Sequence, residues 1–242
     1  MAVVGGDARP TIVFLHGTRL NAGQWATQIS ALGDEFRCVA IDLPGHGTRQ
    51  DERFTLDAAA ARVVQAIDDE AGGRAILVGL SLGGYVAIEV AAGHPDKVAG
   101  LVLAGTTAEP TGLRSMPYIG LALLLLAIRP SILARLNTWF FRFRYPPEIA
   151  EPIIAGGWGF RGGSVAVRSL VGREFAPRLA LYPGRTLIVN GEFDLLFRLS
   201  ERRFAREAAS ARRVTLPRAT HLSNLDQPDR FSAAVRSFAA RL

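Results

Sequence analysis

Three short, mostly apolar runs lie in the first third of the chain, at residues 11–15, 37–43 and 75–80. Runs of this length that are rich in Val, Ile and Leu suit strands covered on both faces. A glycine-containing turn follows each run and ends the strand. The pattern therefore predicts three buried parallel strands.

Helical spacing appears between and after these runs. Residues 55–71 carry apolar side chains on one side of a helix and charged side chains on the other, which predicts an amphipathic helix. Residues 82–95 predict a second helix, which a glycine and a proline end. Residues 98–104 then predict a further apolar strand.

This alternation breaks between about residues 106 and 183, where proline, glycine, aromatic residues and a leucine-rich helix replace it. It resumes with strands and helices at 186–190, 200–209, 213–216 and 228–242. Strands that alternate with helices predict an α/β fold with a mostly parallel, doubly wound sheet flanked by helices. We assign residues 1–106 and 183–242 to this core, and residues 107–182 to an inserted helical lid.

One motif in the core carries chemistry. Gly79-Leu80-Ser81-Leu82-Gly83 lies between a predicted strand and a predicted helix, as a G-x-S-x-G nucleophile elbow does. A serine hydroxyl is a weak nucleophile, so the elbow needs a base beside it and donors for the oxyanion. The backbone N–H of Leu82, at the start of the helix, is one candidate donor. Taken alone, the motif also suits a purely structural strand-to-helix turn.

Two further motifs occur in order along the chain. His16-Gly17 ends the first predicted strand, with Trp25 shortly after it, and residues 42–47 read Asp-Leu-Pro-Gly-His-Gly. Together with the elbow around Ser81, they resemble the α/β-hydrolase family over nearly the whole chain. The resemblance implies that the backbone N–H of Thr18 is the second oxyanion donor, and that His16, Gly17, Gly79 and Gly83 support the elbow and the oxyanion loop.

The base and the acid follow from the order nucleophile, acid, histidine that this fold uses. Of the four histidines, only His221 follows a late strand, and its loop resembles the catalytic-histidine loop of the family. An imidazole there can take the Ser81 proton and return it to the leaving group. The acid should follow the strand at 186–190, where Asp194 matches the position of the family better than Glu192; Asp226 is a third candidate.

Composition narrows the cellular setting and the partners. The formal charge is +6, and 27 of the 28 basic residues are arginines, because Lys97 is the only lysine. The arginines are scattered and accompany no nucleic-acid-binding module, so we expect no nucleic-acid partner. Cys38 is the only cysteine, and residues 1–10 lack the features of a signal peptide, so we expect a cytoplasmic protein of open oligomeric state. The apolar stretch at 116–128 is too short to cross a bilayer.

The expected lid has an unusual composition, since residues 111–147 contain five arginines, many apolar residues and no acidic residue. It could roof the substrate pocket, with an arginine that meets an anionic substrate group or a membrane surface. The interpretation that we favour for each arginine is that it faces water while an apolar stripe packs on the sheet. Aromatic residues that could contact substrate are Trp25, Trp139, Phe140, Phe143 and Trp158.

These features predict a serine hydrolase that cleaves a carboxylic ester or lactone of a hydrophobic small molecule through an acyl-Ser81 intermediate. We expect no metal, since no His, Asp, Glu or Cys cluster has the spacing of metal ligands. We also expect no cofactor: residues 157–162 match the dinucleotide-binding motif G-x-G-x-x-G, but no predicted strand precedes them, and we interpret them as a flexible loop. Two alternatives stay open on this fold: hydrolysis of a C–C bond in a vinylogous diketone, and a non-hydrolytic ligand-binding or tailoring protein.

Overall fold

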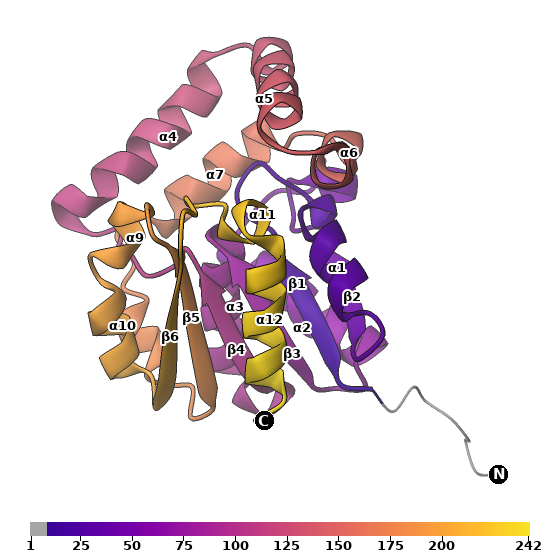
Figure 1. Cartoon of the computed structure of the whole chain (residues 1–242). Helices are drawn as coiled ribbons and strands as arrows, with labels where there is room; N and C mark the ends of the chain where they lie inside the picture. The colour runs from indigo at the N-terminus through magenta and orange to yellow at the C-terminus, as the bar shows by residue number, and fades with distance from the viewer. Residues whose placement is uncertain (1–8) are drawn as a thin grey trace.

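A six-stranded parallel sheet runs through the centre of the molecule (Figure 1). The structure is a computed structural model that describes residues 9–242. The expectation that residues 1–10 contain no signal peptide therefore falls mostly outside the described residues. The strand order is β2-β1-β3-β4-β5-β6, and every neighbouring pair is parallel. The strands are β1 (Thr11–Leu15), β2 (Arg37–Ile41), β3 (Ala75–Leu80), β4 (Val98–Ala104), β5 (Arg185–Gly191) and β6 (Ser210–Leu216).

Helices cover both faces of this sheet because successive strand residues point to opposite sides. Ile12 and Phe14 pack on one side with the two helices α1 and α12, whereas Val13 and Leu15 pack on the other side with α2 and α3. Both sets are fully buried, which explains why the strand sequences do not alternate between apolar and polar residues. The core helices are α1 (Ala26–Leu32), α2 (Leu56–Glu70), α3 (Leu82–Gly93), α9 (Leu195–Arg198), α10 (Glu201–Glu207), α11 (Ser223–Asp226) and α12 (Pro228–Ala239). Short 3₁₀ turns occur at η1 (Ala22–Trp25), η2 (Gly47–Arg49) and η3 (Pro95–Lys97).

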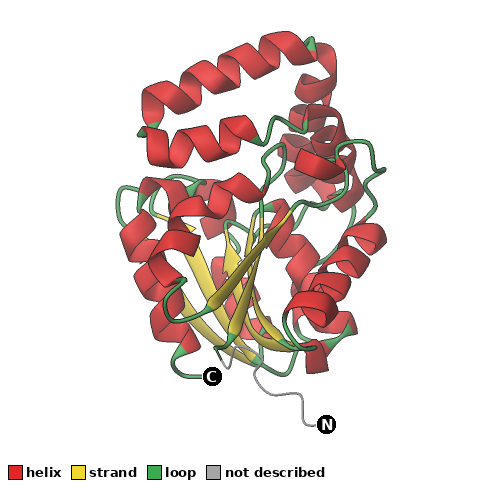
Figure 2. Ribbon diagram, turned by 90° about the vertical axis from the view of Figure 1, so that its right-hand side faces the viewer, coloured by secondary structure: helices red, strands yellow, loops and turns green. Residues whose placement is uncertain are grey.

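The stretch between β4 and β5 is helical and lies over the carboxyl ends of the strands (Figures 1 and 2). We call it the helical segment; it contains η4 (Gly112–Ser115), α4 (Met116–Ala127), α5 (Pro130–Arg144), α6 (Pro147–Ala155), α7 (Phe160–Leu170) and α8 (Ala176–Leu179). In the described chain, no single helix has the length and apolar character to cross a membrane. Only α4 with η4 and α5 together satisfy those criteria, with a bend of 113° between them.

The structure differs from the sequence-based expectation at the glycine-rich stretch 157–162. Residues 157–159 form a loop, but α7 begins at Phe160, and both parts pack against the loop that follows β2. A Cβ atom at Gly162 would overlap the backbone of Gly45, and one at Gly159 would overlap the ring of His46. These glycines allow two backbones to approach closely, and they join the helical segment to the core.

Candidate active site

Ser81 lies at the turn between β3 and α3, in the backbone conformation of a nucleophile elbow. Its φ of 53° and ψ of −115° are rare for a residue with a side chain. A hydrogen bond of 2.8 Å from its N–H to the carbonyl of Ala104 holds the turn against β4. Cβ atoms at Gly79 and Gly83 would overlap the backbones of Gly83 and Leu15, respectively, so the turn tolerates only glycine at these positions. The backbone thus presents Ser81 above the carboxyl end of the sheet.

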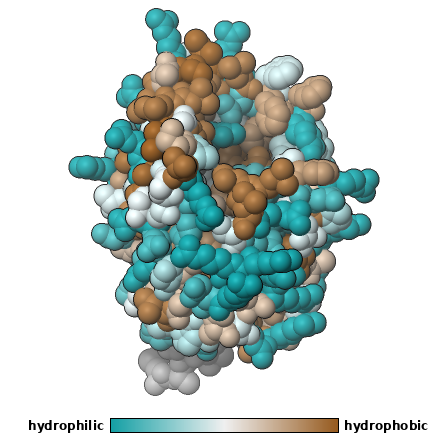
Figure 3. Space-filling model, turned by 90° about the vertical axis from the view of Figure 1, so that its left-hand side faces the viewer, coloured by the Kyte–Doolittle hydropathy of each residue, from teal (hydrophilic) through white to brown (hydrophobic). Residues whose placement is uncertain are grey.

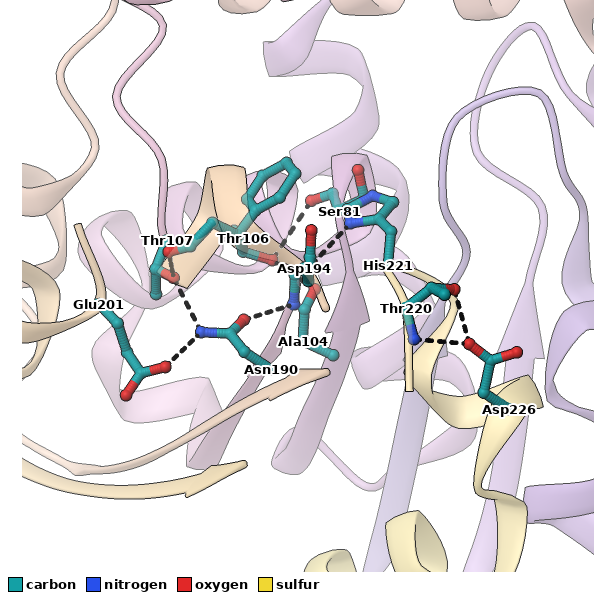
Figure 4. Close-up of polar contacts among 12 residues, drawn as sticks. Ser81, Ala104, Thr106, Thr107, Asn190, Asp194, Glu201, Thr220, His221 and Asp226 are labelled. Atoms are coloured by element: carbon teal, nitrogen blue, oxygen red, sulfur yellow. Dashed lines mark hydrogen bonds and ion pairs between the residues drawn. The ribbon is translucent and has the colours of Figure 1, made fainter. Parts of the chain in front are cut away.

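His221 and Asp194 form a hydrogen-bonded pair beside Ser81 (Figure 4). His221 lies in the loop after β6, Asp194 lies at the end of β5 where α9 begins, and the Nδ1–Oδ2 distance is 2.9 Å. Phe197 stacks on the imidazole with ring centroids 4.5 Å apart, which restrains the ring. Because Nδ1 contacts the carboxylate, Nε2 is the nitrogen left for the neighbouring serine.

The other two acidic candidates have different partners. Glu192 is half-buried and accepts a hydrogen bond from the backbone N–H of Arg218. Asp226 accepts hydrogen bonds from the backbone and hydroxyl of Thr220, and its second oxygen pairs with Arg144 at 2.8 Å. Of the three carboxylates, therefore, the structure brings Asp194 to the imidazole.

A buried polar network lies behind this pair. Asn190 accepts a hydrogen bond from the N–H of Gly105, and its amide donates to Thr107 and to the buried carboxylate of Glu201 (Figure 4). Gly105 has a φ of 53°, and a Cβ atom there would stand 2.8 Å from the His221 ring. Sequence reasoning missed these residues, because only the tertiary structure shows what a glycine or a buried amide contacts.

Ser81 and His221 open on one cavity of about 390 Å³. Its wall is mainly apolar and comprises Gly17, Thr18, Arg19, Leu20, Leu80, Ser81, Leu82, Pro117, Tyr118, Leu121, Phe140, Val167, Leu170, Leu196, Phe197, His221 and Leu222. Thr18 and Leu82 border it, and within residues 9–242 neither backbone N–H has a hydrogen-bond partner. Two free donors next to a serine and an imidazole could stabilise negative charge on a bound oxygen.

The loop carrying Thr18 is tied to the loop carrying His221. Gln24 accepts a hydrogen bond of 2.8 Å from the N–H of Gly17, and its amide donates to Asn224 at 3.2 Å. Asn224 in turn donates to the carbonyl of Gln24 and to Gln28. This buried amide cluster fixes the separation between the candidate oxyanion donors and the imidazole, and no local sequence pattern indicates it.

The predicted aromatic contacts divide into four groups. Phe140 lines the cavity, whereas Trp25 is fully buried in the core beneath it. Trp139 and Phe143 are exposed on α5 and stack on each other at 5.5 Å. Trp158 packs against Phe141 and Phe160 and donates to Thr138, away from the cavity wall.

His16 supports the site from within the core. It is fully buried, and its Nε2 accepts a hydrogen bond of 3.0 Å from the N–H of Leu43. Burial lowers its pKa, as it does that of the neighbouring His46, whose pKa falls to about 3. Both rings are therefore neutral at pH 7 and act as packing and hydrogen-bonding groups. Across the described chain, no cluster of three or more His, Cys, Asp or Glu residues could hold a metal ion.

The chain was compared with known proteins. The sequence model of the alpha/beta hydrolase family matches residues 12–234. The chain belongs to the alpha/beta hydrolase family. The crystal structure of an enol-lactonase from Burkholderia xenovorans superimposes with a TM-score of 0.82 at 24% identity, covering 99% of this chain and 94% of that one. At this identity, the likeness shows the fold alone.

Curated relatives of this alpha/beta hydrolase match a shorter stretch. An esterase of Mycobacterium tuberculosis is 39% identical over 105 residues, which is 42% of this chain and 35% of the relative. A pimeloyl-[acyl-carrier protein] methyl ester esterase of Nitrosomonas europaea is 39% identical over 98 residues, which is 40% of this chain and 38% of the relative. The matched stretches thus span less than half of the length of these relatives.

Proposed function

We propose that this alpha/beta hydrolase cleaves a carboxylic ester or lactone of a hydrophobic small molecule, with Ser81 as nucleophile, His221 as base and Asp194 as the residue that orients the base. The supporting observation is that a serine at a positive-φ elbow and a carboxylate-bound imidazole open on the same apolar cavity. Esterases among the similar proteins agree with this activity.

In this mechanism, Ser81 Oγ attacks the carbonyl carbon while its proton moves to Nε2 of His221. The negative charge that forms on the carbonyl oxygen is stabilised by the N–H groups of Thr18 and Leu82. The imidazolium then donates its proton to the departing alkoxide, which leaves an acyl-Ser81 ester. Water, deprotonated by His221, hydrolyses this ester and restores the serine.

In this proposal, the helical segment is a lid over the cavity and comprises residues 107–182. Pro117, Tyr118 and Leu121 from α4 and Phe140 from α5 form part of the cavity wall, so the segment helps to exclude water from the reacting groups. Burial raises the pKa of Tyr118, so its hydroxyl stays protonated; it shares a hydrogen bond of 2.7 Å with the hydroxyl of Tyr85.

A fluorophosphonate probe tests the nucleophile directly. The wild type should be labelled and should hydrolyse 4-nitrophenyl butyrate, whereas Ser81→Ala should do neither. Ser30→Ala, which alters an exposed serine on α1, serves as the control and should behave as the wild type. Equal labelling of Ser81→Ala would refute the proposal. Saturable binding of ester without any product, unchanged in Ser81→Ala, would favour a non-hydrolytic ligand-binding protein.

A second comparison tests the acid. Asp194→Asn should lower kcat steeply, by up to ~10⁴-fold as in a serine protease, because the amide stabilises the wrong imidazole tautomer. Glu192→Gln, an isosteric change at the neighbouring carboxylate that does not contact His221, should retain wild-type kcat. Similar kcat values for these two variants would contradict the role given to Asp194.

A further inference from the structure

Arg19 is a cavity residue that the proposed mechanism does not use. It follows Thr18 in the loop after β1 and contributes to the cavity wall. Its φ of 59° is unusual for a residue with a side chain, and its carbonyl accepts a hydrogen bond of 3.0 Å from the N–H of Gly159. The backbone is thus held by the helical segment in a conformation that places arginine next to a candidate oxyanion donor.

The charge of Arg19 lacks a matching carboxylate. Its Nε donates to the neutral side chain of Asn137 at 3.0 Å, and no Asp or Glu of the described chain lies within ion-pair distance of it. Burial lowers the pKa of the guanidinium, yet an arginine stays protonated in proteins. The Arg19 side chain is partly buried, and a cation withdrawn from water without a counter-charge is costly, so a bound anion would stabilise this part of the cavity.

The rest of the cavity is suited to an apolar group. Leu80, Leu121, Val167 and Leu196 are among the aliphatic side chains that surround Ser81. An ester that fits such a cavity has an apolar body, and Arg19 offers one cationic position at its edge. We propose that the substrate is an ester or lactone whose apolar body carries one carboxylate, and that Arg19 pairs with this carboxylate. The inference rests on the proposed function and specifies its substrate class.

Matched substrates test this pairing. The mono-4-nitrophenyl ester of glutaric acid and 4-nitrophenyl valerate have acyl chains of equal carbon number, one ending in a carboxylate and the other in a methyl group. The ratio of their kcat/KM values should fall roughly 10- to 100-fold in Arg19→Gln, mostly through the KM of the anionic ester. Arg161→Gln, at an exposed position on α7 outside the cavity wall, should keep the wild-type ratio. An equal loss on both substrates would mean that Arg19 only supports the loop, and would overturn the inference.

A binding measurement separates this inference from the proposed function. The inert pair 4-phenylbutyrate and 4-phenylbutyramide can be titrated into Ser81→Ala with Arg19 intact, without any hydrolysis. The carboxylate should bind at least 10-fold more tightly than the amide. Tighter binding of the carboxylate, together with a wild type that hydrolyses no ester, would refute the proposed function alone. Equal binding of the two compounds in an active hydrolase would refute the role of Arg19 alone.

A second, independent observation concerns the outer surface of the helical segment. Ten large apolar side chains are exposed on η4, α4 and α5, and Figure 3 shows hydrophobic surface gathered at this end of the molecule. We call them the apolar patch: Leu113, Met116, Leu123, Leu124, Leu126, Ile132, Leu136, Trp139, Phe140 and Phe143. Trp139 is 65% exposed and Phe143 76% exposed, so a patch of this size has no cover within the described chain.

The charges around the apolar patch indicate what covers it. Residues 111–147 contain five arginines and no acidic residue. Arg142 and Arg144 pair with carboxylates of other segments, whereas in the described structure Arg114, Arg129 and Arg135 have no carboxylate within 4.0 Å. A second copy of the chain seated on this face would bring like charges together, which disfavours a symmetric dimer.

We infer that the apolar patch docks on the surface of an anionic phospholipid bilayer. Exposed Trp, Phe and Leu side chains would enter the interfacial region while the unpaired arginines contact lipid phosphates. Phe140 belongs both to the apolar patch and to the cavity wall, so docking would place the cavity next to the bilayer. An amphiphilic substrate could then pass from the lipid to the cavity.

Vesicle co-sedimentation tests the docking. The protein should sediment with vesicles of phosphatidylcholine and phosphatidylglycerol (7:3), and much less with pure phosphatidylcholine or in 0.5 M NaCl. The double variant Trp139→Ser/Phe143→Ser should lower the partition coefficient about 10-fold or more. The control Leu181→Ser/Leu199→Ser removes two leucines exposed outside the apolar patch and should partition as the wild type.

Two results would overturn the membrane inference. One is partitioning that does not depend on lipid charge or on the aromatic pair. The other is a lipid-free dimer that the double variant at Trp139 and Phe143 dissociates, since a second copy would then cover the apolar patch. Neither result bears on Arg19 or on Ser81.

Discussion

Two helices of this protein have the same length and nearly the same apolar character, but opposite surroundings. Both α3 and α4 contain twelve residues, and neither has a strongly amphipathic pattern. Nine residues of α3 are buried, between the sheet and α2. Only Tyr118, Ala122 and Leu125 of α4 are buried, whereas Leu123, Leu124 and Leu126 face outward.

The difference shows that apolar composition does not fix burial. In α3, hydrophobic residues on all sides of the helix contribute to folding, because every side contacts protein. In α4, only the side that faces α7 and the cavity contributes, and the other side remains available for an external partner. Stability should therefore depend on α3, whereas surface properties should depend on α4.

The largest expected effect comes from removing one aliphatic side chain from each helix. Ile88→Ala in α3 should lower the free energy of unfolding by about 2–5 kcal/mol, because it leaves a cavity in a fully buried site. Leu123→Ala in α4, where the leucine is 57% exposed, should change it by less than about 0.5 kcal/mol. Urea denaturation monitored by circular dichroism measures both changes. Similar losses in the two variants would mean that the outer side of α4 is covered in solution.

A glycine in each helix gives an intermediate effect of opposite sign. A Cβ atom at Gly84 in α3 would overlap the buried side chain of Thr106, so Gly84→Ala should destabilise the protein by about 1–3 kcal/mol. At Gly120 in α4 a Cβ atom meets nothing, and Gly120→Ala should stabilise the protein by about 0.5–1 kcal/mol through helix propensity.

Thermal denaturation of both glycine variants in one buffer gives the comparison. Because Thr106 also lies against the carbonyl of Ser81, Gly84→Ala should slow ester hydrolysis as well. Wild-type stability in Gly84→Ala would contradict the tight packing between α3 and the residues after β4.

The smallest effect concerns the contact that joins the helical segment to the core. The pKa of His46 is lowered by burial and by the neighbouring His16 to about 3, against 6.5 in the unfolded chain. The folded state therefore binds fewer protons, and the stability is complete above pH 6.5 and is lost as the pH falls toward 3. The loss should reach about 1.4 kcal/mol per pH unit below 6.5. Denaturation at pH 7.5, 6.5 and 5.5 measures this slope.

Two histidine variants sharpen that measurement. His46→Asn should reduce the slope between pH 6.5 and 5.5, since one of the two buried histidines with a lowered pKa is gone and His16 remains. His94→Asn, at the exposed end of α3, should leave the slope as in the wild type. A slope that His46→Asn leaves intact would assign the acid sensitivity to His16 or to another group.

The fold was largely predictable because its determinants are local. Buried strands of five to seven residues stand out as apolar runs, and the parallel sheet with helices on both faces is confirmed. Element ends were less predictable: the strand expected at 213–216 begins at Ser210, and the one expected at 37–43 ends at Ile41. β6 is an edge strand whose outer residues are polar, so its first half lacks the apolar pattern of the others.

The candidate site was predictable only in part. A serine between glycines can be recognised from spacing, and a late histidine from its order along the chain. The choice of Asp194 over Glu192 and Asp226 depends on where three loops meet, as does the amide cluster around Asn224. Arg19 was not singled out, because nothing in the spacing of an arginine tells whether a carboxylate lies near it.

The sequence by itself determined the strands, the helices and the sharp turn at Ser81, since those depend on the conformational preferences of neighbouring residues. The tertiary structure decided which acid contacts the imidazole, which arginine borders the cavity without a counter-charge, and which apolar helix stays exposed. These outcomes depend on contacts between residues far apart along the chain, from 27 positions for Asp194 with His221 to 200 positions for Gln24 with Asn224. Contacts of that kind arise only when the whole chain packs, because burial and electrostatic pairing are properties of surroundings and not of local order.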